Sequence, residues 1–191
     1  HFEGIGLHTG KKVTLEIHPK CTPGIIFTVS ETSIPVHPSS VIGTYFCTQL
    51  NQISTVEHVL SALYGLGISA ANLKVYGREC PILDGSAEGF TRSILKAKIR
   101  ELKLSRSFCS PQSPFIIQEK ESYLLCLPAP TLTITYSIDF VKPHLHQCFT
   151  YLHSPSHYLK MIAPARTFAF LSDVSELKAK GLAQGGRFEN A

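Results

Sequence analysis

The sequence predicts an α+β fold with two similar domains, each a sheet packed on helices in a β-α-α-β sandwich. Residues 11–17 alternate apolar and polar side chains, which is typical of a strand with one buried face. Residues 54–63 instead repeat apolar side chains at helical spacing. The order of strands followed by helices recurs after a stretch rich in Ser and Pro, so we predict a first domain over residues 1–104 and a second over residues 105–191.

The composition fits a globular protein with a small ligand better than a nucleic-acid-binding protein. The 191 residues are 43% hydrophobic, enough for a packed core, and the formal net charge at pH 7 is +4. The basic residues are scattered, which favours a small phosphate-bearing molecule over nucleic acid. Six cysteines without a C-x-x-C pair indicate reduced thiols, and neither a leader nor a membrane span is recognisable, so we expect a cytoplasmic protein.

Two helices are predicted in the first half, among strands at residues 11–17, 25–29 and 72–76. Ser54 and Glu57 have the spacing of a capping box at the start of the first helix. The second helix is expected to begin at Ser86 as N-cap and to have Leu95 among its inward side chains.

The second half predicts further strands and two more helices. Residues 115–138 indicate a meander of three strands. A helix then starts with Pro155 at its first position. The last helix is expected to begin at Ser172 or Asp173, with Glu176 as the partner in a capping box.

Glu57 and His58 are the first candidates for chemistry. Both lie in the first turn of a predicted helix, where the helix dipole favours a carboxylate and a neutral imidazole. A neutral imidazole can bind a metal and a neighbouring carboxylate can accept a proton, as metal-assisted hydrolysis requires. On these residues alone, the alternative is a capping Glu beside a surface or core His.

Histidines of the second half are another set of candidate metal ligands. His144 and His146 could share a strand face, and His153 and His157 a helix face. No acidic or Cys ligand accompanies them in the sequence, so we favour the interpretation of exposed loop histidines. Asp84 is likewise interpreted as a turn former in preference to a catalytic group.

Five short motifs occur in the order seen in one known family. They are G-I-G-L-H-T-G-K at 4–11, S-T-V-E-H at 54–58, P-I-L-D-G-S-A at 81–87, A-R-T-F at 165–168 and G-L-A-Q-G-G at 181–186. With these motifs the chain resembles, over its whole length, the zinc-dependent UDP-3-O-acyl-N-acetylglucosamine deacetylases of bacterial lipid A synthesis. The resemblance implies two α+β domains with the active site between them.

The resemblance also implies the reaction and the residues that carry it. Glu57 matches the general base and His58 a zinc ligand, so zinc (Zn2+) would polarise the amide and activate a water whose proton Glu57 takes. Thr167 matches a residue that can hydrogen-bond the developing oxyanion. The substrate would be a UDP-linked acylated glucosamine, and the products acetate and a free amine.

Five further residues match substrate-binding positions of that family. Phe46, Cys47 and Phe168 match positions around the acyl-chain passage. Phe140 matches an aromatic residue that stacks on uracil, and Asp139 lies beside it. Ordinary core packing is the alternative interpretation for each of these residues.

Part of the family pattern is absent from the sequence. The family takes a His and an Asp as further zinc ligands, and a catalytic His, from later segments, whereas the last histidine here is His157. Because catalytic zinc normally has three protein ligands, His58 alone predicts either an inactive fragment of a longer enzyme, with an incomplete second domain, or a degenerate, inactive relative. The full-length enzyme is expected to be a monomer.

Two alternatives to the deacetylase remain open at the level of sequence. One is a non-catalytic module that binds a nucleotide sugar or an acyl chain, and the other is an unrelated metal protein that uses the four histidines named above. Glu57, His58 and Thr167 together favour the enzyme, because a binding module has no need of all three.

Overall fold

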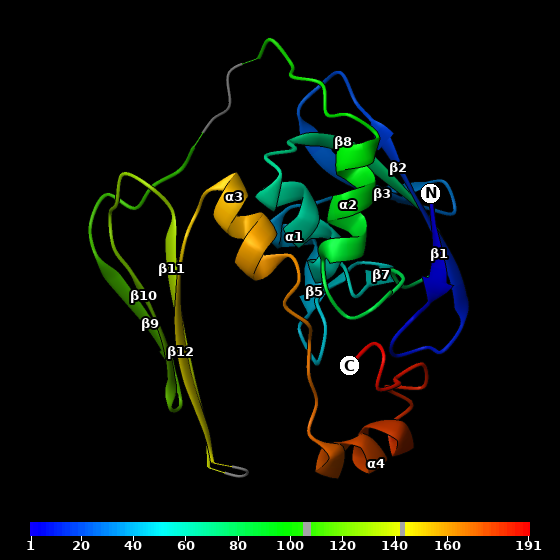
Figure 1. The fold of residues 1–191 in the computed structure, drawn as a ribbon, viewed down its shortest axis with the longest axis vertical. Coiled ribbons are helices and arrows are strands. Elements are labelled where there is room, and N and C mark those ends of the chain that lie inside the picture. The colour runs from blue at the N-terminus through cyan, green and yellow to red at the C-terminus, as the bar shows by residue number, and fades with distance from the viewer. Residues whose placement is uncertain (105–107, 142–143) are drawn as a thin grey trace. The chain divides into compact units, whose positions relative to one another are not determined.

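The computed structural model confirms the α+β class. It describes residues 1–104, 108–141 and 144–191, whose strands and helices are shown along the chain in Figure 1. No helix in these ranges is long and apolar enough to cross a membrane.

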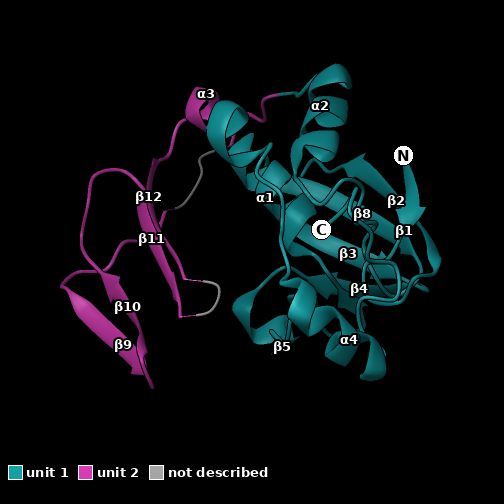
Figure 2. Ribbon diagram, turned by 60° about the horizontal axis from the view of Figure 1, so that its bottom comes forward, with its two compact units in different colours: residues 1–100, 158–191 teal, residues 101–157 magenta. Residues whose placement is uncertain are grey.

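The chain divides into two compact units (Figure 2). Unit 1 comprises residues 1–100 and 158–191, and unit 2 comprises residues 101–157. The predicted domain boundary adjoins residues 105–107, which lie outside the described residues, and it stays a prediction.

A five-stranded sheet forms the centre of unit 1. Its spatial order is β1-β2-β8-β3-β4, with β3 parallel to β8 and all other neighbours antiparallel. The strands are β1 (Phe2–Ile5), β2 (Lys12–Pro19), β3 (Gly24–Val29), β4 (Thr32–Pro35) and β8 (Ala70–Tyr76). The three predicted strands are therefore confirmed as β2, β8 and β3, which are the three inner strands.

Two helices share a core with this sheet. The helices α1 (Glu57–Gly65) and α2 (Glu88–Lys96) lie side by side (Figure 1). Leu63 of α1 and Phe90 of α2 are fully buried in one cluster with Leu73 of β8. Burying a side chain of this size contributes about 1.5–3 kcal/mol, so the cluster holds both helices on the sheet.

The start of α1 differs from the prediction. Its N-cap is Val56, which forms no side-chain cap bond, and Glu57 Oε2 accepts a hydrogen bond from the backbone N–H of Thr48 at 3.1 Å. Ser54 belongs instead to β7 (Ile53–Ser54) of a small sheet. The predicted capping box is wrong, because a residue of the preceding loop uses the carboxylate. The other members of the small sheet are β5 (Val41–Gly43), after a 3-10 turn at Pro38–Ser40, and β6 (Gln49–Leu50).

The start of α2 is close to the prediction. Ser86 Oγ accepts a hydrogen bond from the N–H of Glu88 at 3.0 Å, although Ala87 occupies the N-cap position. Asp84 Oδ1 accepts from both the N–H and the hydroxyl of Ser86, at 3.1 and 2.8 Å, as a turn former does. Leu95 is 45% exposed, so its predicted inward position is wrong.

The last segment of unit 1 packs back onto α1. It contains a π-helical turn (Tyr158–Ile162) and α4 (Leu171–Ala179). The Tyr158 ring covers Gly65, where a Cβ would collide with it. The predicted capping box of the last helix is wrong, because α4 starts at Phe170 as N-cap and Glu176 pairs with Lys180 at 2.6 Å.

Unit 2 consists mainly of two β-hairpins. The hairpins are β9 (Phe115–Glu119) with β10 (Ser122–Cys126), and β11 (Thr133–Phe140) with β12 (Leu145–Leu152). The predicted three-stranded meander is wrong, because β11 pairs with the unpredicted β12 and the described residues form no β10–β11 pair. The short helix α3 (Pro155–His157) begins at the predicted proline, and Ser154 Oγ accepts from the N–H of His157 at 3.2 Å.

Candidate active site

Glu57 and His58 begin α1 and are both half-buried. The bond from Thr48 fixes one oxygen of the Glu57 carboxylate. Burial lowers the pKa of His58, while the carboxylates of Glu57 and Asp84 act to raise it. The net shift keeps the imidazole neutral near pH 7, with a carboxylate beside it that can accept a proton.

The Asp84 turn joins this pair to the A-R-T-F motif. Asp84 is close enough to His58 for its charge to act on the imidazole. Its backbone carbonyl accepts a hydrogen bond from Arg166 Nε at 2.8 Å, and the carbonyl of Gly85 accepts from the N–H of Thr167 at 2.8 Å. Thr167 is therefore anchored to the turn that contains Asp84.

The two glycine-rich motifs lie against each other in the same unit. The N–H of Gln184 donates to His8 O at 3.2 Å, and the N–H of Gly185 donates to Leu7 O at 2.9 Å. The first motif also accepts a bond at Ile5 O from the N–H of Ile82, at 3.0 Å. Hydrogen bonds thus connect four of the five motifs: the first with the third and the fifth along the chain, and the third with the fourth. The remaining motif contains Glu57 and His58.

Glu79 is a part of this arrangement that the sequence analysis missed. It lies in the chain between β8 and the Asp84 turn, and its side chain is fully buried. Its oxygens accept hydrogen bonds from the first glycine-rich motif and from Thr55, which precedes α1. The only local signal in the sequence is that Glu79 precedes two apolar residues, Cys80 and Pro81. This pattern does not distinguish a buried glutamate from an exposed one.

The three residues matched to the acyl passage differ in how far they are buried. Cys47 is half-buried, and burial raises the pKa of its thiol, with Thr55 opposing and Glu57 adding to the effect. Cys47 directly precedes Thr48, whose N–H binds the Glu57 carboxylate. Phe46 and Phe168 are 54% and 55% exposed, and a shared passage between them stays a prediction.

Asp139 and Phe140 lie in unit 2, at the end of β11. Asp139 faces His146 across the hairpin, and Asp139 Oδ1 lies 2.6 Å from His146 Nδ1. Phe140 is half-buried opposite Leu145. Their predicted role in binding uracil stays a prediction.

The four histidines of unit 2 do not gather into one cluster. His144 precedes β12, whereas His146 lies within it, so the shared strand face that the disfavoured metal site would use is not formed. His153 Nδ1 lies 2.8 Å from the Tyr151 hydroxyl, and His157 Nδ1 lies 3.0 Å from Leu152 O.

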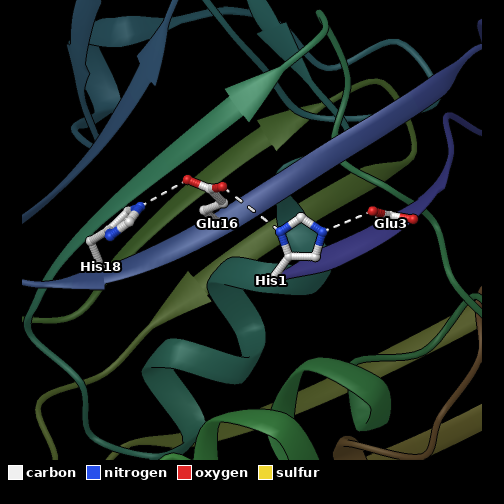
Figure 3. A network of polar contacts seen from close by, with 4 residues as sticks. All are labelled: His1, Glu3, Glu16 and His18. Carbon is white, nitrogen blue, oxygen red and sulfur yellow. Dashed lines mark hydrogen bonds and ion pairs between the residues drawn. The ribbon is translucent and has the colours of Figure 1, made fainter.

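Histidines and carboxylates also meet at the edge of the unit 1 sheet. His1 lies 3.0 Å from Glu3 and 3.7 Å from Glu16, which in turn lies 3.0 Å from His18 (Figure 3). These pairs are solvent-exposed, and the pKa of Glu16 is lowered chiefly by its hydrogen bond to His18. Exposed pairs of this kind contribute little to stability, because solvent screens their charges.

The donor set of this chain does not by itself fit a catalytic zinc ion. Within residues 1–104, 108–141 and 144–191, no three His, Cys, Asp or Glu side chains are grouped so that they could hold a metal. Catalytic zinc normally needs three protein ligands. His58 can supply one of them. All six cysteines are free thiols, as expected.

A carboxylate beside a neutral imidazole on a rigid α+β core is an arrangement typical of hydrolytic enzymes. The sequence model of one family, LpxC, described as UDP-3-O-acyl N-acetylglycosamine deacetylase, matches residues 1–191. The chain belongs to this family.

Curated relatives carry the name UDP-3-O-acyl-N-acetylglucosamine deacetylase. The relative from Leptospira biflexa is 38% identical over 201 residues, covering 100% of this chain and 67% of the relative. That from Citrifermentans bemidjiense is 36% identical over 200 residues, covering 100% and 66%. That from Legionella pneumophila is 38% identical over 200 residues, covering 98% and 66%. The chain spans about two thirds of the length of these relatives.

Proposed function

We propose that the protein is a deacetylase that hydrolyses the acetamide of a UDP-3-O-acyl-N-acetylglucosamine, as in lipid A synthesis. The observation that carries the proposal is the Glu57–His58 pair, built into the core of unit 1 and adjacent to the Asp84 turn that anchors Thr167. Family membership over the whole chain, together with the relatives' names, supports the substrate class.

The residues of this chain take distinct parts in the proposed hydrolysis. Glu57 accepts the proton of the attacking water, with the bond from Thr48 holding its carboxylate in place. The Thr167 hydroxyl donates to the oxyanion that forms on the amide carbonyl. The products are acetate and the free amine of the sugar.

We further propose that the binding residues act on the two ends of the substrate. Phe46, Cys47 and Phe168 contact the acyl chain, and Asp139 and Phe140 contact the uridine. The free cysteines are in keeping with a cytoplasmic location, which we propose for the protein. We also expect the complete protein to be a monomer.

Zinc is proposed as the cofactor of the complete protein, with His58 as one ligand. The described residues do not complete the set, so the other ligands are expected in the part of the relatives that this chain does not match. On this proposal the 191 residues are a fragment and are inactive alone.

A non-catalytic binding module is the second candidate. The incomplete ligand set among the described residues favours it. Such a module would bind the nucleotide sugar or the acyl chain without releasing acetate.

The test is to incubate UDP-3-O-acyl-N-acetylglucosamine with protein made from the complete coding sequence, and separately with the 191-residue chain. We expect equal amounts of acetate and free amine, and about one zinc per chain, from the complete protein only. Substrate binding without acetate release would favour the binding module. Zinc held by the 191-residue chain after a His58→Ala substitution would point to the histidines of unit 2 instead.

A further inference from the structure

Glu79 is a buried carboxylate with an unusually complete set of hydrogen-bond donors. Oε1 accepts from the N–H of His8 at 2.8 Å and from the Thr55 hydroxyl at 2.9 Å. Oε2 accepts from the N–H and the hydroxyl of Thr9, at 2.9 and 2.7 Å. Within the described part of the chain, Glu79 forms no ion pair. Burying an unpaired carboxylate is costly, so these four donors are what makes its position tenable.

Thr55 has an unfavourable backbone conformation directly before the catalytic pair. Its φ is +57°, in the left-handed region, where a β-branched residue is a genuine outlier. Such a conformation costs about 1–3 kcal/mol and persists only when the surroundings fix it. The bond to Glu79 is one such constraint. Further constraints are the backbone bonds of the neighbouring Ser54, whose N–H donates to Arg78 O at 3.1 Å and whose carbonyl accepts from the N–H of Cys80 at 3.0 Å.

The glycine-rich motif is shaped around the same carboxylate. A Cβ on Gly6 would collide with Glu79 Oε2 and with the Thr9 hydroxyl. Gly6 is therefore needed for Glu79 to reach its donors. The buried Glu79 side chain therefore links the first glycine-rich motif to Thr55, two positions before Glu57.

We propose that Glu79 is a positioning residue that acts through Thr55 to set the direction in which α1 presents Glu57 and His58. This inference rests on the deacetylase proposed above. Glu79 is fully buried and accepts the hydrogen bond of the Thr55 hydroxyl, so it has no surface open to bulk solvent and acts through Thr55. Its loss lowers kcat more than it raises KM, because displaced catalytic groups bind substrate but react slowly.

Thr55→Val tests the link with the smallest change in shape. It removes the hydroxyl that donates to Glu79 and keeps the branched side chain. In the complete protein we expect kcat to fall about 10- to 100-fold, with KM changed by less than about twofold. Thr55→Ser, which keeps the hydroxyl, should restore most of kcat.

Thr91→Val is the matched control. The Thr91 side chain is equally buried, and its hydroxyl donates to Ala87 O at 2.8 Å within α2. The control should lower the melting temperature as Thr55→Val does and leave kcat unchanged. A Thr55→Val enzyme with the wild-type kcat would overturn the proposal, as would an equal loss of kcat in both valine variants.

Gly6→Ala tests the same link through Glu79. The added Cβ displaces the Glu79 carboxylate, while the Thr55 side chain keeps its hydroxyl. Gly43→Ala is its control, because a Cβ there would have only ordinary contact, 3.7 Å from Gln49 Oε1. The readout is the NMR signals of the backbone amides of Glu57 and His58, which needs no turnover. We expect them to shift with Gly6→Ala and Thr55→Val, and to stay in place with Gly43→Ala and Thr91→Val. Unmoved signals in the first two variants would overturn the positioning role, whereas wild-type protein without turnover would overturn only the deacetylase.

Discussion

Unit 1 and unit 2 contain the same kinds of elements but differ in what they bury. Unit 1 has a continuous core of fully buried side chains shared by its sheet, α1 and α2. Among the described residues of unit 2, Tyr151 alone is buried. Large apolar side chains of both hairpins, such as Ile116, Leu124 and Tyr136, are 57–69% exposed. Two-stranded hairpins of this kind have little stability of their own.

On the proposed function, the catalytic residues fall in the unit that has a packed core. Glu57, His58, Thr167 and all five family motifs belong to unit 1, which contains the packed core. Catalytic groups must be held to within fractions of an ångström, whereas a stacking contact with a base tolerates more movement. The residues matched to uridine, Asp139 and Phe140, are the ones found in unit 2.

The largest expected effect compares one leucine of each unit, buried in unit 1 and exposed in unit 2. Leu73→Ala in β8 empties a fully buried position and should lower the free energy of unfolding by about 2–5 kcal/mol. Leu124→Ala in β10 removes a side chain that is 57% exposed and should change it by less than about 0.5 kcal/mol. Urea unfolding of the two variants measures both values. Equal losses would mean that Leu124 is buried in solution.

This contrast also explains which elements could be predicted from sequence. The strands β2, β3 and β8 could be predicted because their apolar side chains pack on the core, and in β2 these alternate strictly with polar ones. β12 was missed because Leu145–Leu152 mixes His, Gln and Thr with apolar residues on exposed faces. The capping boxes predicted for α1 and α4 were wrong because each glutamate has another partner: Glu57 accepts from Thr48 in the preceding loop, and Glu176 pairs with Lys180 one turn further on.

The candidate site divides in the same way. Glu57 and His58 are adjacent in sequence, so their proximity could be predicted. The link from Asp84 to His58, and the anchoring of Thr167 at Gly85, depend on contacts between distant segments. Glu79 could not be predicted because its donors lie 24 to 71 positions away in the chain.

An effect of intermediate size separates the two binding regions in the complete protein. Phe168→Asp in unit 1 should raise KM about 10- to 100-fold for a long-acyl substrate and much less for a short-acyl one, because the charge displaces apolar contact. Phe140→Ala in unit 2 should raise KM for both substrates by a similar factor, since base stacking does not depend on the acyl chain. Steady-state kinetics with the two substrates distinguishes these patterns. A Phe168→Asp enzyme that loses both substrates equally would place Phe168 outside the acyl passage.

The smallest effect is a pH dependence that belongs to unit 1. Burial lowers the pKa of His58 below its ordinary value of about 6.5, so the unfolded chain binds a proton more readily than the folded one. Well above about pH 6.5, His58 is neutral in both the folded and the unfolded state and does not make stability depend on pH. Below that value the unfolded state binds the proton more tightly, so the folded state becomes less stable.

We therefore expect wild-type protein to lose more stability between about pH 7.5 and pH 5.5 than His58→Gln does. His146→Gln in unit 2 is the control, because it removes an exposed imidazole paired with Asp139. Unfolding curves at the two pH values measure the difference. Parallel losses in wild type and His58→Gln would show that His58 is not shielded from solvent.

The most direct test of the account is the rate of acetate release by the complete protein with Glu57→Gln, set against Asp139→Asn. Both variants replace a carboxylate by an amide, one in each unit. We predict that Glu57→Gln lowers kcat by about 100- to 10,000-fold with the fold intact, because the amide cannot accept the proton of water. Asp139→Asn should keep kcat and raise KM. A Glu57→Gln enzyme with the wild-type kcat would contradict the assignment of the chemistry to unit 1.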